Sequence, residues 1–438
     1  MPVRLHAPAL LPCDRDNECT VVRDAALDID AAGRIGYAGP RADAPSPNGV
    51  TVTELSGILL PGLINAHAHS PMTVLRGMGG DLPLLRWLRE VIWPAEARMG
   101  PADIRAGMVL GSVEMLRHGV TTSAEMYFQG EQVVDAVLAT GARIVLGCPI
   151  IDLPGMDWRA MIAEVDRWID ADGVRFGPAD RIEVGYGPHS AYMLPQEALR
   201  QTADSAVERG ALMQVHVAEA RDEDENQRQG HGSVPKLLDA VGMLDGRVLA
   251  AHCVHMSDED IALFADRGVG VAHCPGSNAK LASGIAPLTA LRDAGIAIGL
   301  GTDGPASNDD LDLWHEVQLA AMLARLSTRD STALSADEAL LMATRGGAAA
   351  LGRDDIGVLE PGRWADLVHV DLDDPTFAGG IDVPDEQLLA NLVWGAGSRR
   401  VRDVWVAGDQ VVAAAEPTKV DRTEAQAVVR SAGERVRV

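Results

Sequence analysis

The sequence repeats one pattern between residues 57 and 305, in which a short β-branched and aliphatic run ends in polar residues and precedes a longer stretch rich in alanine and leucine. Eight such runs occur, at residues 57–69, 119–127, 142–152, 181–190, 211–219, 247–255, 268–278 and 296–307. Strands that alternate with helices form parallel sheets, and eight repeats over about 250 residues match the usual size of a (β/α)8 barrel. We therefore expect an α/β protein with a TIM-type barrel over residues 57–357.

The two ends of the chain show a different pattern. Residues 1–56 and about 358–415 are short alternating pieces separated by turn residues, which predicts β-strands rather than helices. The last stretch, TEAQAVVRSAGERV, predicts a closing helix. The simplest arrangement is a small β-sandwich domain built from residues 1–56 and 358–438, the second part including this helix, with the barrel inserted between them.

Composition excludes several classes of partner. The chain of 438 residues has 63 acidic and 38 basic side chains and a formal net charge of −25, which repels phosphate backbones and anionic lipid headgroups. No run of 18 or more apolar residues is present, and the N-terminus lacks the features of a signal peptide. The five cysteines contain no C-x-x-C pair and predict no disulfide framework. We expect a cytoplasmic protein that binds neither nucleic acid nor a membrane.

Histidines stand where the predicted strands end, and the carboxyl ends of barrel strands form the active face of such folds. His67 and His69 close the first run and point to one face, because residues two apart on a strand do so. A single histidine at such a place is more often structural, but five further runs end in His189, His216, His252, His273 and Asp303. Three neutral imidazoles and one carboxylate suit a divalent ion such as zinc and leave a position for water.

Glu219 follows His216 by three residues, just beyond a strand that carries a candidate ligand. Hydrolysis needs a group that accepts a proton from water and passes it to the leaving group, and carboxylates and histidines are the usual carriers. We assign these catalytic roles to Glu219, His252 and Asp303. The acids Glu223 and Glu225, in the charged run that follows, are interpreted as solvated side chains.

A resemblance to a known family lies in the segments PGLINAHAHSPMTVLRG, LPLLRWLREVIWPAE, VGYGPHSAYM, HVAE, AHCVH, HCPGSNAKLASGIAPL and GTDGPASNDDLDLWHE. They resemble the amidohydrolase superfamily. More narrowly, they are similar to its 5′-methylthioadenosine/S-adenosylhomocysteine deaminase branch, which is related to the s-triazine chlorohydrolases. The resemblance extends over nearly the whole chain and includes LEPGRWADLVHVDLD in the predicted β-domain.

The resemblance implies a role for particular residues. It implies one divalent ion, Zn²⁺ in the first place with Fe²⁺ or Mn²⁺ as alternatives, and the ligands fall on His67, His69, His216 and Asp303. The proton shuttle falls on Glu219, and His252 lies beside the metal site. Glu96, in WPAE, would hold ribose hydroxyls, and His189 would contact the substrate. Trp93 is a candidate for stacking on the substrate, with a place in the core as the alternative. Relatives also suggest a homo-oligomer.

Lysine is scarce, and this bears on the number of metals. The chain has only Lys236, Lys280 and Lys419. Amidohydrolases with two metals commonly bridge them with a carbamylated lysine at the end of the fourth barrel strand, and none of the three stands there. This predicts a mononuclear site and argues against ring-amide hydrolysis of the hydantoinase or dihydroorotase kind.

The predicted reaction is hydrolytic deamination of an adenine nucleoside: 5′-methylthioadenosine, adenosine, 5′-deoxyadenosine or S-adenosylhomocysteine. Relatives that use S-adenosylhomocysteine have an arginine at the end of the third strand, and the stretch GCPIID here lacks one. Arg159, in the loop that follows, is either its replacement in substrate binding or a surface residue, so a neutral 5′ group is favoured. The alternatives are a guanine-type deaminase, an s-triazine chlorohydrolase, and a catalytically inactive binding or scaffold paralogue.

Overall fold

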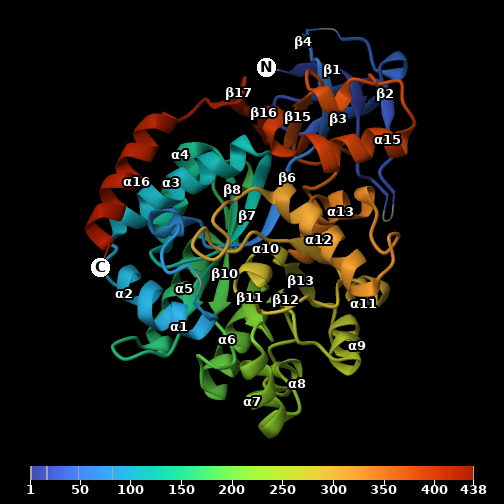
Figure 1. Ribbon diagram of the computed structural model, residues 1–438. Coiled ribbons are helices and arrows are strands. Elements are labelled where there is room, and N and C mark those ends of the chain that lie inside the picture. The colour runs from blue at the N-terminus through green and yellow to red at the C-terminus, as the bar shows by residue number, and fades with distance from the viewer. Residues whose placement is uncertain (1, 16–17, 48, 81, 438) are drawn as a thin grey trace.

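Eight parallel strands close into a barrel in the computed structural model, which describes residues 2–15, 18–47, 49–80 and 82–437 (Figure 1). The strands pair in chain order, and β10 also pairs with β11, which closes the ring. They are β6 (Leu63–Ala68), β7 (Val120–Met126), β8 (Arg143–Ile150), β10 (Ile182–Pro188), β11 (Leu212–Val217), β12 (Arg247–His252), β13 (Gly270–His273) and β14 (Ile298–Leu300). Each of the eight predicted runs contains one of these strands, so the predicted TIM barrel is confirmed.

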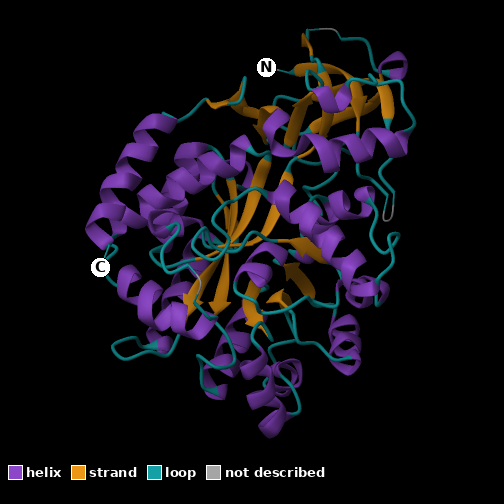
Figure 2. Cartoon of the chain, viewed as in Figure 1, coloured by secondary structure: helices purple, strands orange, loops and turns teal. Residues whose placement is uncertain are grey.

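Helices surround the barrel (Figure 2). They include α3 (Pro101–Arg117), α4 (Gly130–Thr140), α5 (Trp158–Asp172), α6 (Gln196–Arg209), α7 (Arg221–His231), α8 (Val234–Ala240), α9 (Asp258–Arg267), α11 (Leu288–Asp293), α12 (Leu313–Thr328), α13 (Ala336–Met342) and α14 (Arg345–Ala350). Local sequence sets their ends. The Ser257 hydroxyl caps the start of α9, and α6 ends at Gly210, which has a φ of 64°.

The two ends of the chain form a second, mixed sheet above the barrel in Figure 1. Its strands are β1 (Val3–Leu10), β2 (Val22–Ile29), β3 (Ile35–Pro40), β4 (Thr51–Glu54), β5 (Gly57–Pro61), β15 (Leu367–Asp371), β16 (Val401–Val406), β17 (Asp409–Ala413) and β18 (Glu416–Pro417). β5 pairs with β1 and β15, so residues 57–61, which we assigned to the barrel, lie in this sheet instead. The first predicted run therefore supplies one strand to each sheet.

One part of the C-terminal segment is helical where strands were predicted. α15 (Asp385–Ala390) continues into the π-helix η6 (Asn391–Ala396). Its buried side chains are Leu388, Leu389, Leu392, Val393 and Ala396, and this spacing of three and four residues is helical rather than alternating. The predicted closing helix is confirmed as α16 (Arg422–Val436), which packs against α3 of the barrel.

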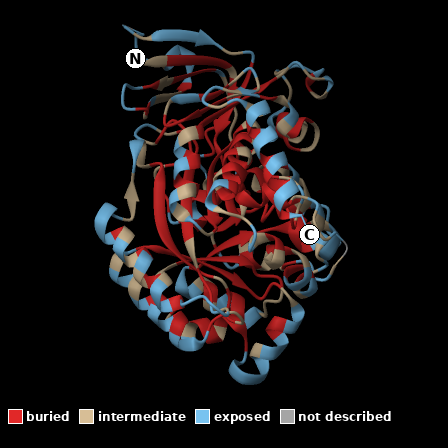
Figure 3. Cartoon of the chain, turned by 90° about the vertical axis from the view of Figure 1, so that its left-hand side faces the viewer, coloured by how far each residue is buried: buried red, intermediate tan, exposed pale blue. Residues whose placement is uncertain are grey.

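A buried ion pair joins the two parts of the fold. Arg143, at the start of β8, donates to Asp366, just before β15, through Nε at 2.9 Å and Nη2 at 3.1 Å. Asp366 also accepts a hydrogen bond from the backbone N–H of Ala407 at 2.7 Å. Buried residues fill the barrel strands and the inward faces of the helices (Figure 3). None of the described helices has the length and apolar character needed to cross a membrane.

Candidate metal and active site

A cavity of about 550 Å³ opens at the carboxyl ends of the barrel strands, where barrel enzymes place their chemistry. Much of its wall is apolar and includes several methionines, tryptophans and leucines. Its titratable lining residues are His69, Glu96, His189, His216, Glu219, His252 and Asp303, together with Tyr127 and Tyr192. One end of the cavity thus collects imidazoles and carboxylates, as the pattern of strand ends predicts.

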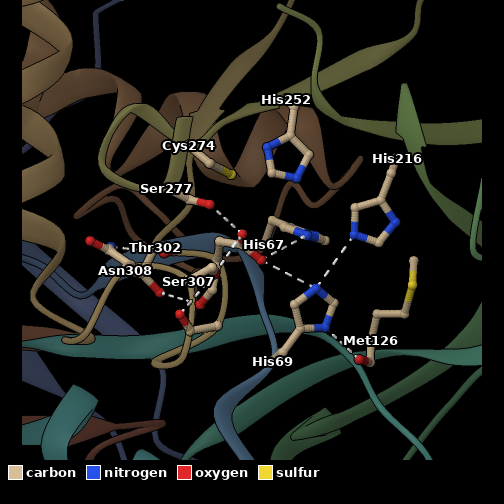
Figure 4. A network of polar contacts seen from close by, with 12 residues as sticks. His67, His69, Met126, His216, His252, Cys274, Ser277, Thr302, Ser307 and Asn308 are labelled. Atoms are coloured by element: carbon tan, nitrogen blue, oxygen red, sulfur yellow. Dashed lines mark hydrogen bonds and ion pairs between the residues drawn. The ribbon is translucent and has the colours of Figure 1, made fainter. Parts of the chain in front are cut away.

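The imidazoles of His67, His69 and His216 point toward one another in Figure 4, and Asp303 contacts two of them. Oδ1 of Asp303 lies 3.3 Å from Nε2 of His69 and 3.7 Å from Nε2 of His67. Nε2 of His216 lies 3.4 Å from Nε2 of His69. Two groups of side chains that share His67 each have their potential ligand atoms within 4.8 Å of one another. One group is His67, His69 and Asp303, and the other is His67, His216 and His252.

Hydrogen bonds outside this cluster orient its imidazoles. Nδ1 of His69 donates to the carbonyl oxygen of Met126, and Nδ1 of His216 donates to that of His189, both at 2.7 Å. Each bond leaves Nε2 facing the cluster. His67 is fully buried, and neither of its ring nitrogens has a hydrogen-bond partner among the described residues. Buried polar atoms normally have partners, so this imidazole is suited to a ligand that is not part of the chain.

Asp303 presents one carboxylate oxygen to the histidines. Its Oδ2 accepts hydrogen bonds from the hydroxyls of Ser277 at 2.6 Å and Ser307 at 2.8 Å, which leaves Oδ1 for the cluster. Asp303 has a backbone φ of 60° and His252 has one of 72°, values that residues other than glycine rarely adopt. Such backbone conformations concentrate at functional sites, where the surrounding structure holds them.

The protonation states also fit a divalent metal. Burial lowers the pKa of His67 and of His216 well below the ordinary value, so both imidazoles are neutral. Burial raises the pKa of Asp303, but the hydrogen bond and charge of His69 outweigh it and hold that pKa well below its ordinary value. Asp303 in turn raises the pKa of His69 to about 9 against the effect of burial. His67 and His216 as neutral imidazoles and Asp303 as an ionised carboxylate are the donors that a divalent cation requires, whereas His69 has to release its proton when the ion binds.

Glu219 and His252 lie together at the side of the cluster. Oε2 of Glu219 is 3.8 Å from Nε2 of His252, and both side chains are buried. Burial raises the pKa of Glu219, which favours its protonated form. Nδ1 of His252 hydrogen-bonds Oδ1 of Asn278 at 2.9 Å, so Asn278 orients His252.

The interpretation of Glu223 as a solvated acid is wrong. Its Oε2 accepts a hydrogen bond from the backbone N–H of Glu219 at 3.2 Å, and only 7% of the residue is exposed. Burial and the charge of Glu219 raise the pKa of Glu223 to about 8. The error arose because α7 turns Glu223 and Asp224 inward and leaves Asp222 exposed, which the run of charges does not reveal. Glu225 is exposed and pairs with Arg221, as expected of a solvated acid.

Three of the predicted substrate contacts line the cavity, namely Glu96, His189 and Trp93. Glu96 lies in the short helix α2 (Trp93–Glu96), and the hydroxyl of Tyr127 donates to its Oε1 at 2.7 Å. The His189 ring stacks on His216 at 4.6 Å between centroids. Tyr127 was not identified from the sequence, although it follows the end of the second barrel strand by one residue, which is the signal that marked the histidines.

Arg159 lies outside the cavity, so the substrate contact considered for it has no support in the structure. It is half-exposed on α5, where its Nη2 donates to Glu197 at 2.8 Å and its guanidinium stacks on Trp158. The reason is that α5 starts at Trp158 and carries Arg159 on an outward face. The three lysines also lie away from the cluster, in ion pairs with Glu259, Asp309 and Asp409.

Residues 58–411 match the amidohydrolase family. The chain belongs to this family. A 5-methylthioadenosine/S-adenosylhomocysteine deaminase of Pelotomaculum thermopropionicum is 43% identical over 415 residues, which is 93% of each chain. An adenosine deaminase of Xanthomonas campestris, solved with bound zinc, has a TM-score of 0.91 and 35% identity over 99% of this chain and 98% of its own. An atrazine chlorohydrolase of Arthrobacter aurescens TC1, complexed with zinc, has a TM-score of 0.88 and 26% identity over 98% and 100%.

These similarities confirm the resemblance to the amidohydrolases and to the triazine enzymes. This amidohydrolase is a metal-dependent hydrolase, and its buried centre of histidines with Asp303 fits a divalent ion. The fit rests on features of this chain: the unpartnered ring of His67, the inward-facing Nε2 atoms and the free Oδ1 of Asp303.

Proposed function

We propose that this amidohydrolase is a deaminase of adenine nucleosides with a neutral 5′ group, such as 5′-methylthioadenosine, 5′-deoxyadenosine or adenosine. The observation that carries the proposal is that one cavity is lined by three of the proposed ligands (His69, His216 and Asp303), by the buried acid Glu219 and by Glu96. A hydrolase of this kind needs a water-activating centre, a proton carrier and a group for the ribose. The names of the relatives support the same reaction.

The proposed metal is a single zinc ion held by His67, His69, His216 and Asp303. Three nitrogen donors and one oxygen donor make a set that zinc accepts, and the relatives solved with zinc support this choice over iron or manganese. When bound, the ion supplies a water of lowered pKa. None of the described residues that line the cavity is a lysine, which supports one metal rather than a lysine-bridged pair.

The side chains of the protein then divide the proton transfers between them. Asp303 and His252 orient the attacking water and accept its proton, because both lie at the cluster and both are fixed by hydrogen bonds from α10 (Pro275–Lys280). Glu219, whose pKa burial raises, donates a proton to the ring nitrogen next to the carbon that bears the amine. The new C–O bond forms as that carbon accepts the water oxygen. The C–N bond then breaks, and a proton passed through Glu219 leaves with ammonia.

Glu96 is proposed to hold the ribose hydroxyls. The Tyr127 hydroxyl already donates to Oε1, which leaves Oε2 and the remaining capacity of Oε1 as acceptors. His189 lies on the substrate side of His216, and burial together with the charge of His69 lowers its pKa to about 4, so it is a neutral hydrogen-bonding group. Trp93 adds an apolar wall next to Glu96.

The preference for a neutral 5′ group follows from the wall of the cavity. Ile151, Leu153, Pro154 and Met156 lie in the segment that follows β8, where S-adenosylhomocysteine-using relatives carry an arginine. No arginine or lysine is among the described lining residues, and Arg159 is engaged outside with Glu197. On binding, the carboxylate of S-adenosylhomocysteine would therefore lose its hydrating water molecules without gaining a cationic partner.

A panel of substrates tests the proposal. Zinc-loaded protein is incubated with 5′-methylthioadenosine, 5′-deoxyadenosine, adenosine, S-adenosylhomocysteine, guanine and a chlorotriazine, while ammonia and chloride are measured. We expect ammonia from the adenine nucleosides and a kcat/KM for 5′-methylthioadenosine at least about tenfold above that for S-adenosylhomocysteine. Ammonia from guanine alone, or chloride from the triazine, would assign one of the alternative reactions. Protein without stoichiometric metal or turnover would be the inactive paralogue.

The homo-oligomer stays a prediction, which sedimentation of the protein in solution tests.

A further inference from the structure

A buried glutamate lies behind the catalytic cluster and contacts neither the cavity nor the proposed metal ligands. Glu316, on α12, is 0% exposed. Its Oε2 accepts a hydrogen bond from the backbone N–H of Gly276 at 2.8 Å, and its Oε1 accepts one from Nδ2 of Asn308 at 3.0 Å. A carboxylate in the interior is costly unless hydrogen bonds hold it in place, so this position calls for a physical reason.

One donor belongs to the turn that contacts the catalytic side chains, and the other belongs to the loop that contains Asp303. Gly276 is the second residue of α10, which follows β13. Asn308 follows β14, and its Nδ2 also donates to the carbonyl oxygen of Thr302 at 2.8 Å, directly before Asp303. Glu316 therefore connects α10, the loop that contains Asp303, and the outer helix α12 through one carboxylate.

The turn that Glu316 holds makes two contacts with the catalytic groups. Ser277 donates to Oδ2 of Asp303 at 2.6 Å, and Asn278 bonds Nδ1 of His252 at 2.9 Å. Both residues follow Gly276 directly in the sequence. A shift of the Gly276 backbone would move both contacts together, because a short helical turn moves as a unit.

The packing around Gly276 shows how closely Glu316 approaches the turn. A Cβ atom at this position would lie 2.3 Å from Oε1 of Glu316 and 2.7 Å from Oδ1 of Asn308. Any side chain larger than hydrogen would force these groups apart. Gly276 and Glu316 belong to the segments HCPGSN and DLDLWHE, which carry part of the family resemblance, although neither residue lines the cavity. Their contact gives these two residues a structural reason.

We propose that Glu316 is a positioning residue for the reaction, which fixes α10 so that Ser277 aims Asp303 and Asn278 aims His252. The proposal rests on the proposed function for the roles of Asp303 and His252. Burial raises the pKa of Glu316 to about 8, whereas the hydrogen bonds from Gly276 and Asn308 lower it. The ionised carboxylate that accepts both bonds therefore prevails above this pH, and the variants below are compared there.

The test begins with Glu316→Gln, which keeps the size but offers only one acceptor oxygen to two donors. Residues that orient metal ligands typically change metal affinity or activity by about 10–100-fold when removed, and we expect a loss of kcat in this range. KM for the nucleoside should change by less than about threefold, because Glu96 and His189 are untouched. The zinc dissociation constant, measured by competition with a chromophoric chelator, should rise by about tenfold through Asp303.

Glu183→Gln is the matched control. Glu183 is equally buried but lies on β10 at the opposite end of the barrel, where it pairs with Arg247 at 2.8 Å and Arg353 at 3.1 Å. This variant should lower the melting temperature and leave kcat and zinc affinity of the folded protein unchanged. If Glu316→Gln also lowers only the melting temperature, Glu316 is structural and the proposal is overturned.

A double-mutant cycle identifies the route of the effect. Glu316→Gln is measured in the wild type and in the Ser277→Ala/Asn278→Ala background, where we expect it to reduce zinc affinity and kcat by less than about twofold further. The full effect in both backgrounds would overturn the proposal. Should Glu316→Gln fail to fold, Asn308→Ala removes the same link from the other side and is judged by the same cycle. Wild-type protein that deaminates no adenine nucleoside would refute the proposed function, whereas the zinc-affinity cycle still tests the positioning.

Discussion

Nε2 of His252 lies 3.8 Å from Oε2 of Glu219 inside the buried wall of the cavity. The other ring nitrogen, Nδ1, forms a hydrogen bond with Asn278, which fixes the orientation of the His252 ring. Two titratable groups at this separation can serve opposite ends of one reaction, with His252 near the attacking water and Glu219 near the base.

Replacing Glu219 by glutamine should remove the proton carrier and leave the metal site intact. We expect kcat to fall by about 10²–10⁴-fold, the range in which general acid–base catalysis contributes, with zinc content unchanged. Glu225→Gln on the following helix, α7, is the control, because Glu225 is exposed and pairs with Arg221. A Glu219→Gln enzyme with near-normal kcat would show that another group carries the proton.

Removing the metal should abolish activity and reduce stability together. Dialysis against a chelator is expected to eliminate turnover and to lower the melting temperature, because an ion that binds only the folded state stabilises it. Readdition of zinc should restore both at one ion per chain, measured by elemental analysis. Activity that survives complete removal of metal would contradict the assignment of His67, His69, His216 and Asp303.

Glu96→Gln should weaken binding of the ribose without affecting the chemistry on the base. The expected result is a loss of about 10–100-fold in kcat/KM for nucleosides, carried mainly by KM, because buried hydrogen bonds to charged groups contribute about 1.5–3 kcal/mol. Tyr127→Phe removes only the hydroxyl that donates to Oε1 and should have a smaller effect. Free adenine, which has no ribose, serves as the comparison substrate. An equal loss with adenine would place Glu96 elsewhere in the mechanism.

Breaking the Arg143–Asp366 pair should destabilise the protein without changing its catalysis. Both side chains are buried, at 0% and 2% exposure, and removing one partner of a buried pair costs about 3–5 kcal/mol. Arg143→Met should therefore reduce the free energy of unfolding in urea by this amount. The double variant Arg143→Met/Asp366→Asn should recover part of it, because the unpaired charge is gone. Unchanged stability in Arg143→Met would mean that the pair does not hold the terminal sheet to the barrel.

Much of the barrel and its ligand cluster follows from local sequence. The eight strands were predictable because each is a short apolar run, and His67, His69, His216 and Asp303 because each stands at or beside the end of such a run. Parallel strands bring their carboxyl ends to one face of a barrel, so residues far apart in the chain are placed together by topology alone.

Other features depend on contacts that no local pattern records. The first run divides between two sheets because β5 pairs with β15, which lies some 300 residues away in the chain. Glu223 looks solvated in a charged run, yet the turn after Ala218, with its φ of 47°, brings it under Glu219. Glu316 reads as one more acid on an amphipathic helix, and only the fold shows that it meets Gly276.

The identity of the product formed from 5′-methylthioadenosine decides whether the protein deaminates adenine nucleosides. Zinc-loaded protein is incubated with this nucleoside, and the purine product is identified by mass spectrometry while ammonia is measured. We expect the inosine analogue, with oxygen in place of the exocyclic amine and one ammonia released per turnover, and formation of this product at least about 100-fold more slowly by Glu219→Gln. An unchanged nucleoside in the presence of stoichiometric zinc, or turnover that Glu219→Gln does not reduce, would contradict this expectation.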